Sequence, residues 1–175
     1  IVHTKDAVWG FGLGQRAESR PGKPDTLLDI KRSVFQIGGV DLSDDSTLRG
    51  AVLDLCGTIL ERAEAPLGGS TGTDATAKVI ALAERLVART TRPILGMGFG
   101  SPGVVNLAGV VLSAPNLGWS NEQLQDTLAS RFGIPVIVWN DARAAVLAEH
   151  STGGGASDLM LARGCHGVGP GPLLP

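Results

Sequence analysis

The sequence has few of the features that mark several large classes of protein. Its two cysteines, Cys56 and Cys165, lie far apart and match no metal-binding spacing, so neither a disulfide framework nor a zinc site is expected. No apolar run approaches the roughly 20 residues that a membrane helix needs. The opening residues "IVHTKDAVWG" lack the basic segment and apolar stretch of a secretion signal. We therefore expect a cytoplasmic protein with no membrane partner.

Composition and charge indicate a globular fold. Hydrophobic residues make up 43% of the chain and charged residues 18%, which supplies enough apolar side chain for a core. The net charge of −2 argues against a chain that binds nucleic acid over its whole surface. The three histidines form no metal-ligand spacing, so no metal is expected. A length of 175 residues allows one domain, or one domain and part of another.

The order of apolar runs and turns predicts an α/β fold. Pro21 and Pro24 interrupt any helix near the start, so residues 1–33 are interpreted as a linker. Helices are expected at 73–90, 120–131 and 141–150, the first two capped by Thr73 and Ser120. Strands are expected at 35–41, 48–55, 58–65, 94–100, 134–139 and 158–162, with a hairpin turn at Cys56–Gly57 and two short strands around Leu107–Gly109.

Asn140 and Asp141 close an apolar run at a predicted junction of strand and helix. In open α/β sheets, ligands bind at the carboxyl ends of strands. An aspartate there can act as a general base, and an asparagine can both donate to and accept from the hydroxyls of a sugar. Both residue types are also favoured helix caps. The pair alone does not separate a cap from a ligand site, and the two roles are compatible.

Three other segments could carry chemistry, and each has a plain structural alternative. The turn "GFGSPGVV" at 98–105 has glycines that let backbone approach a ligand, or could be only a tight turn. It lacks the Gly-Lys-Ser/Thr of a Walker loop. The run "RGCHGVGPG" at 163–171 could present N–H groups to phosphate, or could be a glycine-rich hairpin. Asp41 could hold a nucleotide-bound magnesium. Asp44 and Asp45 follow it, however, and would repel a triphosphate.

Taken in order, these segments resemble the ROK family, which groups sugar kinases with sugar-responsive transcriptional repressors. The resemblance runs from about Leu27 to the last residue and is most specific over 98–150, through "GSPGVV", "APNLGW" and "FGIPVIVWNDARAAVLAEH". It implies an actin-like, ribonuclease-H-like fold of two lobes with sugar between them. On that basis, residues 34–139 form the first lobe and 140–175 begin an incomplete second lobe.

The resemblance also implies roles for particular residues. Gly103, Asn116 and Asn140 would line the sugar site, while Asp141 would bind sugar and, in a kinase, serve as catalytic base. Trp119 is expected to be a packing anchor beside that site. Asp41, Gly167 and Gly169 would be degenerate counterparts of nucleotide and phosphate contacts. ATP and magnesium are implied only for a kinase, and the family's cysteine-rich zinc box is absent from these residues.

Departures from the kinase pattern favour the repressor branch. Kinases carry Asp-x-Gly-Gly-Thr after the first strand, whereas this chain reads "DLSDDST". Pro170 and Pro172 interrupt the second phosphate loop. The stretch "SRPGKPDTLLDI" resembles the connector that follows the winged helix-turn-helix in ROK repressors.

We therefore interpret the chain as part of a sugar-sensing regulator. It would bind a hexose or hexose derivative and contact DNA only through a domain that these residues do not include. The resemblance also implies that it could form a homodimer, which is common in the family. One alternative is an ATP-dependent hexose or N-acylhexosamine kinase with Asp141 as base. A truncated remnant without function of its own is another.

Overall fold

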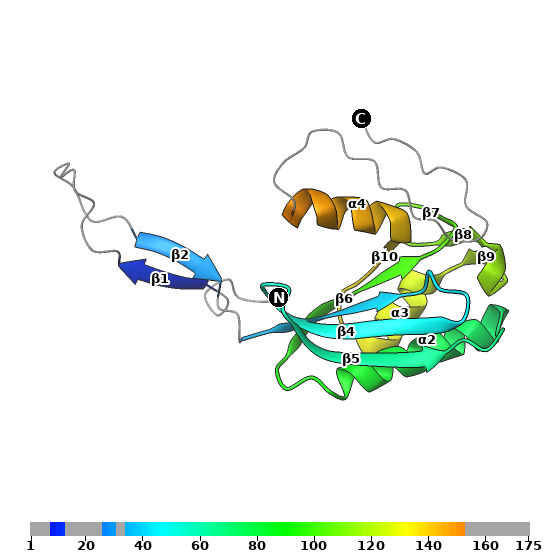
Figure 1. The fold of residues 1–175 in the computed structure, drawn as a ribbon, viewed down its shortest axis with the longest axis horizontal. Coiled ribbons are helices and arrows are strands. Elements are labelled where there is room, and N and C mark those ends of the chain that lie inside the picture. The colour runs from blue at the N-terminus through cyan, green and yellow to red at the C-terminus, as the bar shows by residue number, and fades with distance from the viewer. Residues whose placement is uncertain (1–7, 13–25, 31–33, 153–175) are drawn as a thin grey trace.

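The computed structural model describes residues 8–12, 26–30 and 34–152. Its largest sheet has five strands in the order β10-β6-β3-β4-β5 (Figure 1). The strands are β3 (Gln36–Asp41), β4 (Thr47–Asp54), β5 (Ile59–Pro66), β6 (Ile94–Ser101) and β10 (Val136–Asn140). Strands β10, β6 and β3 pair in parallel, while β4 runs antiparallel to β3 and β5. The carboxyl ends of β3, β6 and β10 therefore share one edge of the sheet.

Helices cover both faces of this sheet. Helices α2 (Gly72–Val87) and α3 (Leu124–Phe132) lie on one face, and α4 (Asp141–Thr152) lies on the other (Figure 1). The main core lies between the sheet and the α2/α3 face, because alternate strand residues point that way: Val40, Val52, Met97, Phe99 and Val138 are all almost fully buried. Helix α4 contacts β6 and β10.

Two smaller sheets complete the described residues. Strands β7 (Val104–Val105), β8 (Val111–Ala114) and β9 (Trp119–Glu122) form an antiparallel sheet, with the 3-10 helix η1 (Pro115–Leu117) between β8 and β9. Strands β1 (Val8–Gly12) and β2 (Thr26–Ile30) pair as an antiparallel two-stranded sheet. None of the helices in the described residues is long and apolar enough to cross a membrane.

Most of the expected elements are present. The hairpin turn at Cys56–Gly57 could be predicted because its hydrogen bonds are local. Strand β4 ends at Asp54, whose Oδ1 accepts from the Cys56 and Thr58 amides at 2.9 and 2.8 Å. Gly57 adopts a φ of +82°, which favours glycine. Turn residues with local bonds of this kind leave a clear signature in sequence.

Two expected caps are wrong. The N-cap of α2 is Thr71, so the helix begins at Gly72 and Thr73 already lies inside it. The helix expected at 120–131 begins only at Leu124, since residues 119–122 pair with β8 as strand β9. Ser120 is therefore a strand residue opposite Ser113. The strand expected at 158–162 lies outside the described residues.

Candidate functional site

Polar side chains gather where the three parallel strands end. Asp41 ends β3, Ser101 ends β6 and Asn140 ends β10. In the register of the sheet, Asp41 lies opposite Gly100, and Asn140 lies opposite Ser101. The central strand β6 is thus flanked by a carboxylate on one side and an amide on the other, at the edge where α/β sheets bind ligands.

Asn140 fixes the start of α4 and also ties it to the neighbouring turn. Its Oδ1 accepts from the Arg143 amide at 3.0 Å, which is a helix-capping bond. Its Nδ2 donates to the Gly103 carbonyl at 2.9 Å and to Asp141 Oδ1 at 3.2 Å. The cap that the sequence allowed is therefore present, and the side chain is held rigidly at the sheet edge.

Asp141 is held by one of its two carboxylate oxygens. Its Oδ1 accepts from the Ala142 amide at 2.7 Å as well as from Asn140. Among the described residues, no donor bonds to Oδ2. This oxygen can accept from a ligand hydroxyl without disturbing the contacts that orient the side chain.

Gly103 contributes through its backbone. Its φ is +80°, and a Cβ built on it would lie 2.0 Å from the Ser113 carbonyl oxygen and 3.0 Å from Ala114 Cα. No other residue fits this position without moving β8. The close approach brings the turn after β6 against Ala114, which precedes η1. The Gly103 carbonyl accepts from Asn140 Nδ2 at the same time.

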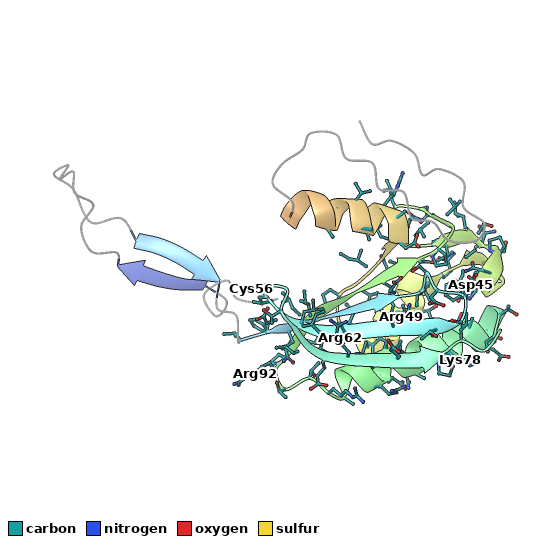
Figure 2. All side chains as sticks on the ribbon, in the orientation of Figure 1. Asp45, Arg49, Cys56, Arg62, Lys78 and Arg92 are labelled. Atoms are coloured by element: carbon teal, nitrogen blue, oxygen red, sulfur yellow. The ribbon has the colours of Figure 1, made fainter. Side chains whose placement is uncertain are left out.

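Asn116 lies on η1 and bonds to the loop that follows β3. Its Nδ2 donates to Asp45 Oδ1 at 2.7 Å, and both side chains are exposed. Figure 2 labels Asp45 at the end of the sheet where Figure 1 labels β9. No local pattern predicts this contact, because the two residues are 71 positions apart. Asp45 was expected only to repel phosphate.

Trp119 is the packing anchor of η1 that was expected. The side chain is 3% exposed, and its Nε1 donates to the Gly72 carbonyl at 3.1 Å. Gly118, which precedes Trp119, turns the chain with a φ of +64° and lies close to the side chain of Thr71. The loop that carries Asn116 is therefore fastened to the start of α2.

Asp41 and Asp141 line the same pocket, of about 560 Å³, between the sheet and α4. Gly39, Gly98 and Gly100 form its floor. A Cβ on Gly100 would lie 3.6 Å from Asp141 Cα, so the glycine lets α4 approach the sheet. Arg49 and Arg62, labelled in Figure 2, border the pocket from β4 and β5.

The loop between β3 and β4 is closed by its own carboxylates. Asp41 Oδ1 accepts from the Ser43 amide at 3.0 Å. Asp44 Oδ1 accepts from the Ser46 amide and hydroxyl at 2.8 and 2.7 Å, and from the Thr47 amide at 3.2 Å. These hydrogen bonds, led by the Ser46 hydroxyl, hold the pKa of Asp44 well below its usual range. Amides that already bond to carboxylates are not free to cradle a phosphate.

Arg49 forms ion pairs with the loop between β3 and β4 and with β5. Arg49 Nη1 lies 2.9 Å from Asp44 Oδ2, and Arg49 Nε lies 3.5 Å from Glu64 Oε1. The Arg49 guanidinium is therefore engaged with two carboxylates. In the part of the chain that the structure describes, no group of three or more His, Cys, Asp or Glu side chains could hold a metal ion. Gly167 and Gly169 lie outside that part.

Comparisons with known proteins identify the family of the chain. A sequence profile of the ROK family matches residues 37–174. The xylose repressor of Caldicellulosiruptor bescii is 30% identical over 169 residues, which is 90% of this chain and 41% of that protein. The glucokinase of Streptomyces coelicolor is 38% identical over 119 residues, which is 67% of this chain and 36% of that protein.

Solved structures show the same fold. A ROK family transcriptional regulator, described as a homolog of the E. coli MLC protein, matches with a TM-score of 0.67 and 25% identity, over 74% of this chain and 34% of that one. The chain spans about 41% of the length of the curated repressors it matches. The expected actin-like sugar-kinase fold, seen here in part, is confirmed. Profile, relatives and structure together show that the chain belongs to the ROK family.

Proposed function

We propose that the chain is the sugar-binding part of a sugar-responsive transcriptional regulator, acting in the cytoplasm. The loop between β3 and β4 carries the proposal. The family resemblance implies that kinase members receive phosphate on an Asp-x-Gly-Gly-Thr loop at this position. Here the Ser43, Ser46 and Thr47 amides bond to Asp41 and Asp44 instead. Phosphoryl transfer depends on positioning and on stabilising negative charge, and this loop offers neither.

The proposed ligand is a neutral sugar at the carboxyl edge of β3, β6 and β10. Asp141 Oδ2 would accept from one hydroxyl, and Asn140 and Asn116 would border the same site. The Gly103 carbonyl, which accepts from Asn140, would keep the amide in place. D-xylose and D-glucose are the first sugars to test, because relatives are named xylose repressor and glucokinase. An N-acylhexosamine is the third.

The proposed mechanism is allosteric. Sugar would bridge two lobes and alter the placement of a DNA-binding domain in the whole protein. A ligand shifts such an equilibrium only by its differential affinity for the two states. The match to the xylose repressor covers 90% of the chain and so must include part of residues 1–33, whereas the glucokinase match covers 67%. This difference favours the regulator.

The alternative function is sugar phosphorylation, which the glucokinase similarity and the position of Asp141 in the pocket favour. An assay that couples ADP release to each sugar separates the two functions. The proposal predicts no ADP above a no-sugar blank, for the wild type and for Asp141→Asn alike. The variant keeps an oxygen that can accept from the Ala142 amide, so it should stay folded. Sugar-dependent ADP release that disappears in Asp141→Asn would establish the kinase instead.

A further inference from the structure

We propose that Asp45 is a positioning residue for the sugar site: it fixes the amide orientation of Asn116 so that the Asn116 carbonyl oxygen faces the ligand. This inference rests on the proposed function, since it assumes that a sugar binds beside η1. The contact that carries it is the hydrogen bond from Asn116 Nδ2 to Asp45 Oδ1 at 2.7 Å.

The chemistry of the pair sets the direction of the amide. An ionised carboxylate can only accept hydrogen bonds, whereas an asparagine side chain has a donor end and an acceptor end. The donor end must therefore face Asp45, and the carbonyl oxygen must point elsewhere. Without Asp45, an exposed asparagine could turn its amide over at little cost.

The surroundings hold both members of the pair in place. Asn116 lies on η1, whose C-terminal side is fastened by buried Trp119 through its bond to the Gly72 carbonyl. Asp45 lies in a loop that Asp44 braces through the Ser46 and Thr47 amides. Each side chain thus projects from a backbone that is fixed independently of the other, so the bond between them orients the amide and is not needed to fold either loop.

The Asn116–Asp45 pair would help to select the ligand. The Asn116 carbonyl oxygen would accept from a sugar hydroxyl, so the ligand must carry a hydroxyl donor at that position. Asp45 also adds negative charge beside the site, which disfavours a phosphorylated sugar. The loop that replaces the kinase phosphate loop would therefore take part in recognising an unphosphorylated sugar.

Reversing the pair tests the inference. In Asp45→Asn, the new amide can face Asn116 with either end, so the orientation is lost. In Asn116→Asp, two carboxylates lie side by side and repel. In the double variant, the amide at position 45 donates to the carboxylate at position 116, whose second oxygen can again accept from the sugar. We expect each single variant to weaken sugar binding about 10-fold and the double variant to recover to within about 3-fold of wild type.

The measurements are calorimetric titrations of the full chain with D-xylose, D-glucose and N-acetyl-D-glucosamine, with thermal unfolding of each variant. Asp126→Asn is the matched control, because Asp126 is an exposed aspartate in the first turn of α3 and belongs neither to η1 nor to the loop between β3 and β4. For the sugar that binds, its monodeoxy derivatives are titrated too. Wild type should discriminate against the derivative lacking the hydroxyl that meets Asn116, and Asp45→Asn should discriminate less.

Each outcome decides between the claims. Recovery in the double variant, with unchanged unfolding temperatures, supports the inference. Wild-type affinity in Asp45→Asn, or a double variant as weak as Asn116→Asp, overturns it while leaving the proposed function intact. Failure of the wild type to bind any of the three sugars overturns the proposed function and this inference together.

Discussion

Replacing Gly103 by alanine should destabilise the chain much more than the same change at Gly57. The two glycines have almost the same φ, +80° and +82°. A Cβ at Gly57 would meet no described atom within 4 Å, whereas one at Gly103 would lie 2.0 Å from the Ser113 carbonyl oxygen. The pair therefore separates the cost of a positive φ from the cost of a steric clash.

The two costs can be estimated. Placing alanine at positive φ costs about 1 kcal/mol, and that is all Gly57→Ala should lose. At Gly103, the backbone of β8 must also move, which adds about 2 kcal/mol. At about 3 °C per kcal/mol, we expect the unfolding temperature to fall by about 3 °C in Gly57→Ala and about 9 °C in Gly103→Ala.

Thermal unfolding followed by circular dichroism measures both variants, and sugar titration gives a second readout. Displacing Gly103 moves the carbonyl that accepts from Asn140, so sugar affinity should fall in Gly103→Ala and stay unchanged in Gly57→Ala. Equal losses of stability in the two variants would refute the claim that close packing against β8 requires glycine at position 103.

Three further predictions concern the same region. Asn140→Ser keeps a helix cap whereas Asn140→Ala does not, so thermal unfolding should show the alanine variant about 1 kcal/mol less stable than the serine variant. Both variants should lose sugar affinity in calorimetry. Full affinity in the serine variant would show that Asn140 is a cap alone. Trp119→Phe removes the bond to the Gly72 carbonyl and should lower the free energy of unfolding in urea by about 1 kcal/mol. Trp119→Ala should lower it by about 4 kcal/mol. Equal losses in the two variants would contradict the role of that bond. Because the folded-state pKa of Asp44 is lowered, its stabilisation is fully present above the ordinary aspartate pKa of about 3.9 and is lost as pH falls toward the lowered value. The stability difference between wild type and Asp44→Asn should therefore shrink in unfolding curves taken below about pH 4, and a difference that grows there would contradict it.

Local patterns in the sequence predicted most of the fold. The α/β order, the turn at Cys56–Gly57 and the junction at Asn140–Asp141 depend on residues close together in the chain, so their signals are short-range. The helix expected to start at Ser120 failed for the opposite reason. Residues 120–122 have polar side chains, but residues 119–122 pair with β8, and pairing between separate strands overrides local propensity.

The candidate site was predictable only in part. Asn140 and Asp141 follow from their place at the end of a strand, and the family resemblance supplied Gly103 and Asn116. The contact of Asn116 with Asp45 was not predictable from one sequence, because it joins residues 71 positions apart. The self-bonded loop between β3 and β4 was also hidden. Asp44 and Asp45 are expected to repel phosphate, and the structure adds that Asp41 and Asp44 accept hydrogen bonds from the Ser43, Ser46 and Thr47 amides.

The most direct test of the sugar site is an equilibrium titration of wild type and Asp141→Asn with D-xylose, D-glucose and N-acetyl-D-glucosamine by calorimetry. The account predicts saturable binding of at least one of these sugars by the wild type and at least about 10-fold weaker binding by the variant, since a buried or oriented carboxylate bond to a hydroxyl contributes about 1.5–3 kcal/mol. Equal affinity in the two proteins would contradict a sugar site built on Asp141.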